Sequence, residues 1–193
     1  MNRTNKANKT IKNTVIITLI IAAAVGLGYF YDKISIYIGK KMHPLTHGEI
    51  VEKYSEEYNV PQYIIYSVIK AESSFRSDAV SEAGAVGLMQ IMPKTYGDIA
   101  GRLGEAAVDG LLYDPETNIK YGTFYLRYLY DMFKEWDLAI AAYNAGLGRV
   151  NEWRRNPEYI KDDEIIYIPI EETRTYLKRV NKNIDNYKKL YFN

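Results

Sequence analysis

Residues 61–75 read PQYIIYSVIKAESSF, a proline followed by successive turns of apolar side chains, and the stretch ends in AESSF at 71–75. Pro61 suits the first turn of a helix, and Glu72 then falls three residues after Ile69, on the apolar face. The pattern predicts a helix whose last turn points a carboxylate at the core. Because burial penalises the charged form, we expect the pKa of Glu72 to be raised, which suits general-acid work near neutral pH.

Glu72 also has a structural interpretation. A buried glutamate can be tied to an arginine, or a frayed helix end can turn the side chain to solvent. The helical spacing by itself leaves these alternatives open.

Composition limits the function classes. The 193 residues allow one ordinary domain plus an appendage, and the net charge is +1. Four cations lie in the first thirteen residues, which leaves 21 basic against 24 acidic residues, or −3, for the rest. That balance argues against nucleic-acid binding. The sequence contains no cysteine, which excludes disulfides, thiol catalysis, iron–sulfur clusters and zinc ribbons. The 19 tyrosines suit a sugar-binding groove and equally suit half-buried packing.

A stretch near the N-terminus has the length of a membrane span. Residues 14–31 contain no charge and would make roughly 27 Å of helix, close to the hydrocarbon thickness of a bilayer. Basic residues precede the span, and Asp32 follows it. This asymmetry predicts a single-pass helix in the cell membrane, with the N-terminus in the cytoplasm and the rest of the chain on the cell-wall side.

A cleaved signal peptide is the alternative, because Ala22-Ala23-Ala24 offers small residues to a peptidase. The protein would then be secreted. Apolar residues continue past these alanines to Tyr29-Phe30-Tyr31, which favours an anchor. The predicted organisation is a cytoplasmic basic tail (1–13), a transmembrane signal-anchor (14–31), a juxtamembrane linker (32–45) and a folded domain (46–193).

No metal or cofactor site is predicted. His43 and His47 have the four-residue spacing of a helical metal pair, but Pro44 between them disfavours a helix, and no third ligand is evident nearby.

The folded domain is predicted to be mainly α. Thr46 to Glu49 has the pattern of a capping box before a short helix, and Asp114-Pro115 is expected to cap a long central one. Residues 76–92 contain small residues without helical period and predict a loop that folds back beside Glu72. No strand pattern of any length is present. Further helices are expected from Pro93, over 137–145 and 148–155, and from about Glu171, where Tyr176, Val180, Ile184 and Tyr187 form an apolar face.

Four motifs then follow one another in a recognisable order. They are ESSF at 72–75 with Ser81 after it, GAVGLMQIMP at 84–93, AAYNAG at 141–146 and ETR at 172–174. This order resembles the catalytic domain of the soluble lytic transglycosylases, enzymes that cut peptidoglycan and whose fold is similar to goose-type lysozyme. The resemblance covers about Thr46 to Asn193. The sequence departs from the family at Arg76-Ser77, where Asn-Pro is usual, and at Asp114, where Asn is common.

The resemblance implies a lysozyme-like helical domain in which Glu72 is the catalytic acid and base and peptidoglycan glycan strands are the partner. It also implies that Tyr143 places a hydroxyl near this carboxyl, and that Gln90 and Tyr143 hold Glu72 and orient a substrate N-acetyl group. Arg174 is expected to be a structural partner of a carboxylate. The residues matching the family's sugar-binding positions are Ser81, Gln90, Met92, Tyr143, Asn144 and Glu172. Protein partners are not indicated.

Two other functions remain open. A hydrolytic muramidase would share Glu72 but would need a positioned water, usually held by a second carboxylate, for which Asp78 and Glu82 are nearby candidates. A non-catalytic glycan-binding module would keep the groove but would have no use for a buried Glu72.

Overall fold

The computed structural model describes residues 3–192, with side chains from residue 12 onward. Contacts concentrate within two units, Met1–Pro44 and Leu45–Asn193, so each is a structural body of its own.

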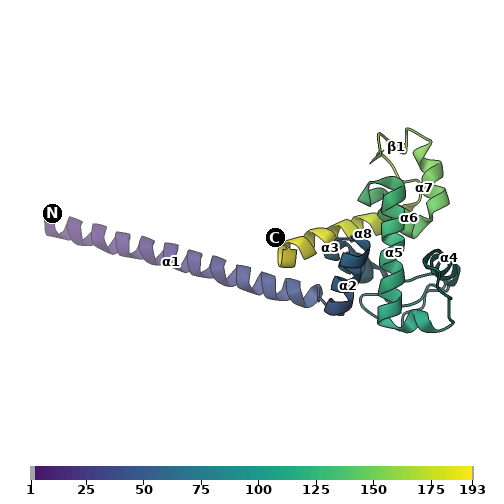
Figure 1. Cartoon of the computed structure of the whole chain (residues 1–193). Coiled ribbons are helices and arrows are strands. Elements are labelled where there is room, and N and C mark those ends of the chain that lie inside the picture. Colours follow the sequence, from purple (N-terminus) through teal and green to yellow (C-terminus); the bar gives the residue numbers. More distant parts are fainter. Residues whose placement is uncertain (1–2, 193) are drawn as a thin grey trace. The chain divides into compact units, whose positions relative to one another are not determined.

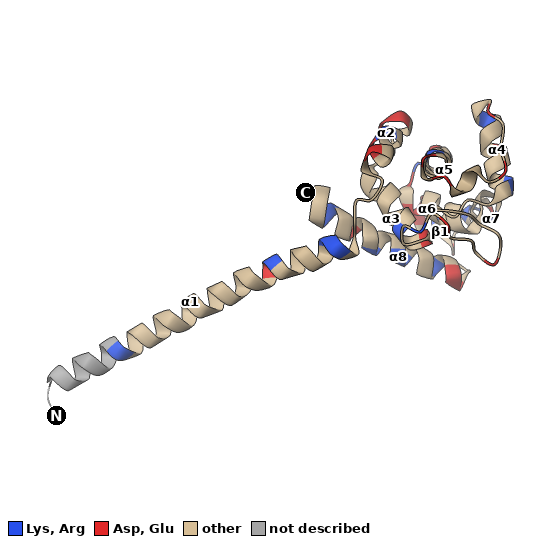
Figure 2. Cartoon of the chain, turned by 90° about the horizontal axis from the view of Figure 1, so that it is seen from below, with Lys and Arg blue, Asp and Glu red and all other residues tan. Residues whose placement is uncertain are grey.

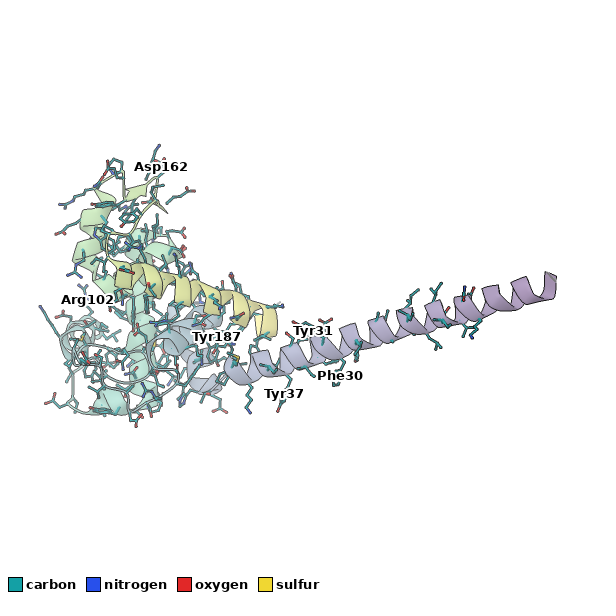
Figure 3. All side chains as sticks on the ribbon, turned by 180° about the vertical axis from the view of Figure 1, so that it is seen from behind. Phe30, Tyr31, Tyr37, Arg102, Asp162 and Tyr187 are labelled. Carbon is teal, nitrogen blue, oxygen red and sulfur yellow. The ribbon has the colours of Figure 1, made fainter. Side chains whose placement is uncertain are left out.

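The first unit is a single helix, α1 (Arg3–Met42). Its part Lys12–Met42 contains an 18-residue window with a mean hydropathy of 2.1, so by length and composition it is able to span a membrane. Figure 2 shows a long uncharged stretch of this helix, and in Figure 3 Phe30, Tyr31 and Tyr37 project outward from it. An apolar helix whose side chains are exposed needs a partner other than water.

The predicted subdivision of this unit agrees with the structure only in part. The apolar span expected at 14–31 lies within α1, and residues 32–42, expected as linker, continue the helix. The side chains of the predicted basic tail lie outside the described residues as far as residue 11.

The second unit is a helical domain, as the sequence predicts. Figure 1 shows α5 running through it; α6 packs against α5, and α8 packs against α3 and α6. The elements are α2 (Gly48–Tyr58), α3 (Gln62–Glu72), α4 (Pro93–Leu103), a 3₁₀ turn (Leu111–Tyr113), α5 (Pro115–Phe133), α6 (Trp136–Ala145), α7 (Leu147–Arg154), the strands β1 (Ile160–Lys161) and β2 (Glu164–Ile165), α8 (Glu171–Tyr187) and a π-helical end (Lys188–Phe192).

The longest helix of this domain, α5, begins where predicted. The Asp114 carboxylate accepts a hydrogen bond from the Thr117 N–H at 2.8 Å, and Pro115 occupies the first turn. Both devices satisfy or remove backbone N–H groups that a helix start leaves unpaired. The helix packs against α2 on one side and α6 on another, so it is central to the domain.

Helix α3 is buried on more than one face. Six consecutive residues, 64–69, are buried, and the helix packs chiefly against α8. Helix α6 is buried from Leu138 to Ala142, where three alanines allow neighbouring helices to approach closely. The end of α3, the end of α6 and the start of α8 are thereby brought together.

Two local expectations are wrong. Thr46 does not form a capping box, because α2 starts at Gly48 behind His47, which has a left-handed φ of 62° and makes no side-chain cap. The chain enters this helix through backbone geometry instead of through a hydroxyl. The expectation of no strands is the second error, because residues 160–165 contain the short antiparallel hairpin of β1 and β2.

The turn of that hairpin explains the second error. Asp162 and Asp163 have φ of 52° and 62°, and two such residues between paired strands make the turn type that matches strand twist. Asp tolerates this conformation, and Figure 3 labels Asp162 at the outer end of the domain. Strands of two residues are too short to leave an alternating pattern in the sequence.

Candidate active site

Glu72 is the last residue of α3, where the chain turns sharply away. The Ser73 hydroxyl donates to the Leu88 carbonyl at 2.8 Å and ties the helix end to the following loop. Ser74 and Phe75 then have left-handed φ of 52° and 67°. This conformation costs free energy in non-glycine residues, so the surrounding contacts must impose it. The result fixes Glu72 at the edge of the core.

The Glu72 carboxyl is half-buried, and burial raises its pKa to about 7. The Tyr176 hydroxyl and the Arg179 guanidinium act in the opposite direction, and the Glu172 carboxylate raises the pKa further. Among the described residues no cation forms an ion pair with it within 4 Å. The structural interpretation as a buried Glu–Arg pair is therefore not what this site contains. At neutral pH the carboxyl can both give and take a proton.

Two tyrosines surround this carboxyl. The Tyr176 hydroxyl lies close enough to lower the pKa of Glu72, although it has no partner in regular hydrogen-bond geometry among the described residues. Burial raises the pKa of Tyr143 and Tyr176 well above the usual value, and the charge of Glu72 raises both further. Both hydroxyls therefore stay protonated, as donors, throughout the neutral range.

The hydroxyl of Tyr143 is directed to the backbone. It donates to the Met89 carbonyl at 2.8 Å and so connects α6 to the loop 76–92. The expectation that Tyr143 holds Glu72 by hydrogen bond is not what the structure shows. Its ring lies near the carboxyl, but its donor is used to position the loop.

The loop 76–92 forms one wall of the site. Asn118, buried on α5, donates to the carbonyls of Val86 at 2.9 Å and Leu112 at 2.7 Å and accepts from the Met89 N–H at 2.7 Å. Gly87 lies against this amide with φ +80°, and a Cβ there would approach the Asn118 side chain to 2.2 Å. One buried amide thus satisfies three backbone groups and fixes the loop on α5.

Ser81, Gln90 and Met92, predicted to bind sugar, all belong to this loop. The Ser81 hydroxyl accepts the Ala85 N–H at 2.9 Å, and the Gln90 side chain donates to the carbonyls of Ala79 and Gly87 at 3.1 and 2.9 Å. These two polar groups are engaged in the loop's own structure. Met92 is 39% exposed and presents its thioether side chain to solvent.

Asn144 and Glu172 lie on a second wall, formed by the end of α6 and the first turn of α8. The side-chain amide oxygen of Asn144 accepts from the Thr173 hydroxyl at 2.7 Å, which joins the end of α6 to the first turn of α8. Asn144 and Glu172 line a polar pocket of about 300 Å³ together with Glu171, Thr175, Tyr176 and Arg179. The pocket therefore adjoins the Glu72 carboxyl through Tyr176.

Arg174 is structural, but its partners differ from the expected carboxylate. Its guanidinium donates to the carbonyls of Ile168 and Pro169 and to the Tyr167 hydroxyl. It clamps the segment before α8.

Two residues of the site were not among those predicted from the sequence. Tyr176 has the spacing of an apolar helix face and was assigned to that face, so only the fold reveals that its hydroxyl meets Glu72. Arg179 is an exposed residue three positions later, and no local pattern distinguishes it from the other basic residues of α8. The one sequence signal for Tyr176 is its position two residues after the ETR motif at 172–174.

Other candidate groups lie elsewhere. Asp78 and Glu82, considered as a second carboxylate, are exposed and are not among the groups that shift the pKa of Glu72, whereas Glu172 is. Within the described part of the chain, no group of three or more His, Asp or Glu side chains is arranged to hold a metal ion.

The family model described as "Transglycosylase SLT domain" matches residues 49–166, which span the end of α3, the loop and the Tyr143 helix. The chain belongs to the transglycosylase SLT domain family. The SLT domain is 37% identical over 143 residues to the soluble lytic murein transglycosylase of Escherichia coli K12, a match that covers 71% of this chain and 22% of that protein. It is 33% identical over 165 residues to the membrane-bound lytic murein transglycosylase C of Actinobacillus pleuropneumoniae serotype 5b, over 72% of this chain and 44% of that one.

Solved structures agree with the sequence relatives. An inactive mutant of lytic transglycosylase Slt from Pseudomonas aeruginosa is 33% identical with a TM-score of 0.70, over 78% of this chain and 25% of that chain. A complex of the 70-kDa soluble lytic transglycosylase with bulgecin A is 34% identical with a TM-score of 0.74, over 80% and 26%. The predicted lysozyme-like transglycosylase fold is confirmed. The SLT domain protein matches less than half of the length of each of these relatives.

Proposed function

We propose that this chain is a peptidoglycan lytic transglycosylase in which Glu72 is the single acid and base. The observation that carries the proposal is a half-buried carboxyl without an ion pair, with a pKa of about 7, beside a polar pocket. The names of its relatives, lytic murein transglycosylases, support the substrate class.

In the first step, the protonated Glu72 carboxyl donates its proton to the oxygen of the β-1,4 bond between N-acetylmuramic acid and N-acetylglucosamine. The bond from C1 to this oxygen breaks, and the N-acetyl group of the muramic acid stabilises the cationic C1. Most glycosidases divide this work between two carboxylates. Here the substrate supplies the second group.

In the second step, the 6-hydroxyl of the same muramic acid attacks C1, and the Glu72 carboxylate takes the hydroxyl proton. The product ends in 1,6-anhydro-N-acetylmuramic acid, no water is consumed, and Glu72 is protonated again. A pKa near 7 suits both steps, because each protonation state is populated at neutral pH.

The neighbouring groups would assist as follows. Tyr176 donates to Glu72 when it is ionised, which stabilises the state between the two steps. Tyr143 keeps the loop wall in place through Met89, and the polar side chains of the two walls contact the sugars. The residues assigned to sugar contact in this proposal are Ser81, Gln90, Met92, Asn144 and Glu172.

We further propose that α1 anchors the domain to the cell membrane as a single-pass helix, with the N-terminus in the cytoplasm and residues 46–193 on the cell-wall side. The apolar stretch of α1 and the membrane-bound relatives support this. N-terminal sequencing of the protein from membranes tests it. A mature chain that begins after residue 24 would instead identify a cleaved signal peptide and a secreted protein.

Mass spectrometry of the fragments released from purified peptidoglycan tests the chemistry. The detergent-solubilised full chain should release fragments one water lighter than hydrolytic products, and Glu72→Gln should release none. Reducing ends would identify a hydrolytic muramidase. Binding to peptidoglycan without any product would identify a glycan-binding module, and both results would overturn the proposal.

A further inference from the structure

The π-helical end of α8, Lys188–Phe192, carries lysines next to apolar side chains. It reads KKLYF, with Lys189 and Phe192 exposed and Lys188 and Leu190 half-buried. Phe192 is 39% exposed. Neither lysine forms an ion pair within 4 Å inside the described part of the chain. The two cations and the Phe192 ring are therefore available to a partner outside the domain.

Aromatic contacts hold this segment in a defined place. The Lys188 ammonium lies 4.6 Å from the centroid of the Tyr63 ring, at the start of α3, and the Phe192 ring meets the same ring edge-on at 6.0 Å. Tyr191 stacks on the buried Tyr187, with ring centroids 6.2 Å apart. An ammonium group that lies over a ring keeps its N–H donors, so Lys188 can still bind an anion.

The same aromatic rings lead to the start of the domain. Tyr187 stacks on Tyr66 with ring centroids 5.4 Å apart. A Cβ at Gly48, the first residue of α2, would lie 3.8 Å from the Tyr66 hydroxyl. The π-helical end therefore lies close to the first turn of α2. Gly48 follows Met42, the last residue of α1, by six positions, which is at most about 20 Å of chain.

The proposed span of α1 brings lipid near this part of the domain. If α1 crosses the membrane, the short connection keeps the start of α2 near the lipid surface, and the π-helical end with it. Lys40 and Lys41, in the last turn of α1, suit the headgroup level. Lysines attract anionic headgroups, and aromatic rings favour the boundary between headgroups and hydrocarbon. The segment KKLYF offers both kinds of side chain.

Charge distinguishes this segment from the neighbouring helix. The exposed residues lining one face of α2 are Glu49, Glu52, Lys53, Glu56 and Glu57. Residues 182–192 instead hold the exposed Lys182, Lys188 and Lys189 against one acid, Asp185. Figure 2 shows the acidic side of α2 apart from the blue of the π-helical end. A membrane with anionic lipids repels the α2 face and attracts the π-helical end, which gives the domain a preferred orientation.

We propose that the π-helical end binds the surface of the membrane that α1 spans, with Lys188 and Lys189 on anionic phospholipid headgroups and Phe192 at the boundary with the hydrocarbon. The inference rests on the proposed anchoring by α1 and goes beyond it, because the domain is then held against the lipid in one orientation. An anionic polymer of the cell wall would also satisfy the lysines. It would have no use for an exposed Phe192 ring, so the lipid surface fits the segment better.

Fluorescence quenching on the labelled full chain in vesicles tests this contact. The sequence has no cysteine, so one introduced cysteine carries the only label. Leu190→Cys reports on the π-helical end, Ala23→Cys on the uncharged stretch of α1, and Ala107→Cys on the exposed loop after α4. Figures 1 and 2 both show α4 and the end of α8 on different sides of the domain. Lipids with a nitroxide in the headgroup or in the acyl chain quench nearby labels. If Leu190→Cys loses helical signal in circular dichroism, the exposed Asp185→Cys replaces it.

In vesicles of phosphatidylcholine and phosphatidylglycerol, headgroup nitroxides should quench the label at residue 190 and not that at residue 107. Lys188→Gln with Lys189→Gln should lower the ratio of quenched to unquenched label by about thirtyfold, since each lysine contributes about fivefold near an anionic surface. The control, Lys94→Gln with Lys161→Gln, removes the same charge from exposed lysines on α4 and β1 and should match wild type. The loss should shrink at high salt and in phosphatidylcholine alone.

The label in α1 separates this proposal from the anchor. If acyl-chain nitroxides quench the label at residue 23 but headgroup nitroxides leave the label at residue 190 unquenched, the lipid contact fails and the anchor stands. If the label at residue 23 is not quenched, the anchor fails, and the contact fails with it. Equal losses in the two double variants would overturn the assignment to this segment. A label at residue 190 that is shielded from a water-soluble quencher only by added polyglycerol phosphate would identify an anionic polymer as the partner instead.

Discussion

Two regions of the domain place glutamate carboxyls beside tyrosine hydroxyls, with opposite results. Between α4, α5 and α2, Glu105 and Glu116 are exposed, and each accepts hydrogen bonds from a lysine and a tyrosine. Those bonds lower the pKa of both carboxyls. At the end of α3, Glu72 meets a tyrosine without a paired cation, and burial raises its pKa to about 7.

The difference shows what makes a carboxyl titrate near neutral pH in this protein. Residue types do not decide it, because glutamate and tyrosine occur in all three places. The pKa is decided by the exclusion of water and by the absence of an ion-paired lysine. The carboxyls of Glu105 and Glu116 are engaged by residues of α5 and α2, and that of Glu72 is free to exchange a proton.

The activity of matched variants tests this difference between the carboxyls most directly. Glu72→Gln should reduce the rate of peptidoglycan cleavage by about 10² to 10⁴-fold, the usual contribution of a general acid, whereas Glu116→Gln should stay near wild type. Fragment release from purified peptidoglycan measures both. Equal loss in the two variants would mean that the contrast between the carboxyls has no catalytic meaning.

Stability against pH should show the same contrast in Glu72→Gln. The raised pKa means that the folded state binds this proton more tightly than the unfolded state, so wild-type stability is full below about pH 4.5 and falls as the pH rises through about 7. Glutamine does not ionise. The variant should therefore gain up to about 3 kcal/mol relative to wild type between pH 4 and pH 8.

Urea unfolding followed by tryptophan fluorescence measures this gain, since both tryptophans, Trp136 and Trp153, lie in the domain. A free-energy difference between variant and wild type that is the same at pH 4 and pH 8 would contradict a raised native pKa.

Arg179→Gln sharpens the comparison by removing a cation that acts on Glu72 from a distance. Because the guanidinium lowers the pKa of Glu72, its loss should raise that pKa and move the alkaline limb of the activity profile to higher pH. Tyr143, Tyr176 and Glu172, the other titratable groups facing Glu72, are unchanged. The expected effect is less than tenfold in the rate ratio between pH 8 and pH 6, since the charge is exposed and screened. The ratio in Lys182→Gln serves as the control, and a limb that moves to lower pH would contradict the geometry.

The smallest effect is expected for Glu116→Gln. Its lowered pKa means that the contribution of this carboxylate is present above the unfolded pKa and disappears as the pH falls through the folded one. The variant should melt at most about 2 °C below wild type at pH 7, because exposed ion pairs contribute little. Thermal melts at pH 7 and pH 3 measure this, and the difference between the two proteins should be smaller at pH 3 than at pH 7.

Much of the fold could be predicted because its signals are local. The proline at 93, the Asp114-Pro115 start of α5 and the apolar spacing of α8 placed the helices within a few residues. Glu72 could be singled out because a charge on an apolar face is a conflict that the sequence displays.

What escaped prediction depends on contacts between distant segments. Tyr176 reads as packing, since a tyrosine on an apolar face carries no sign of where its hydroxyl points. Tyr143 was expected to hold Glu72, but its donor goes to Met89, which only the folded loop brings within reach. Thr46 matched a capping pattern, yet the residue that precedes the helix is His47, in a left-handed conformation, and the helix begins at Gly48. The sugar-binding roles remain predictions.

The backbone of Met89 can report on how firmly the loop is held in the site. Its N–H is bonded to the Asn118 side chain, and its carbonyl accepts the hydroxyl of Tyr143, so one residue joins α5, the loop and α6. The exchange of this amide hydrogen with deuterium is therefore slowed while the loop stays bonded to Asn118 of α5. In an exchange experiment without substrate, the protection of Met89 would distinguish a wall that opens locally from one that opens only when the whole domain unfolds.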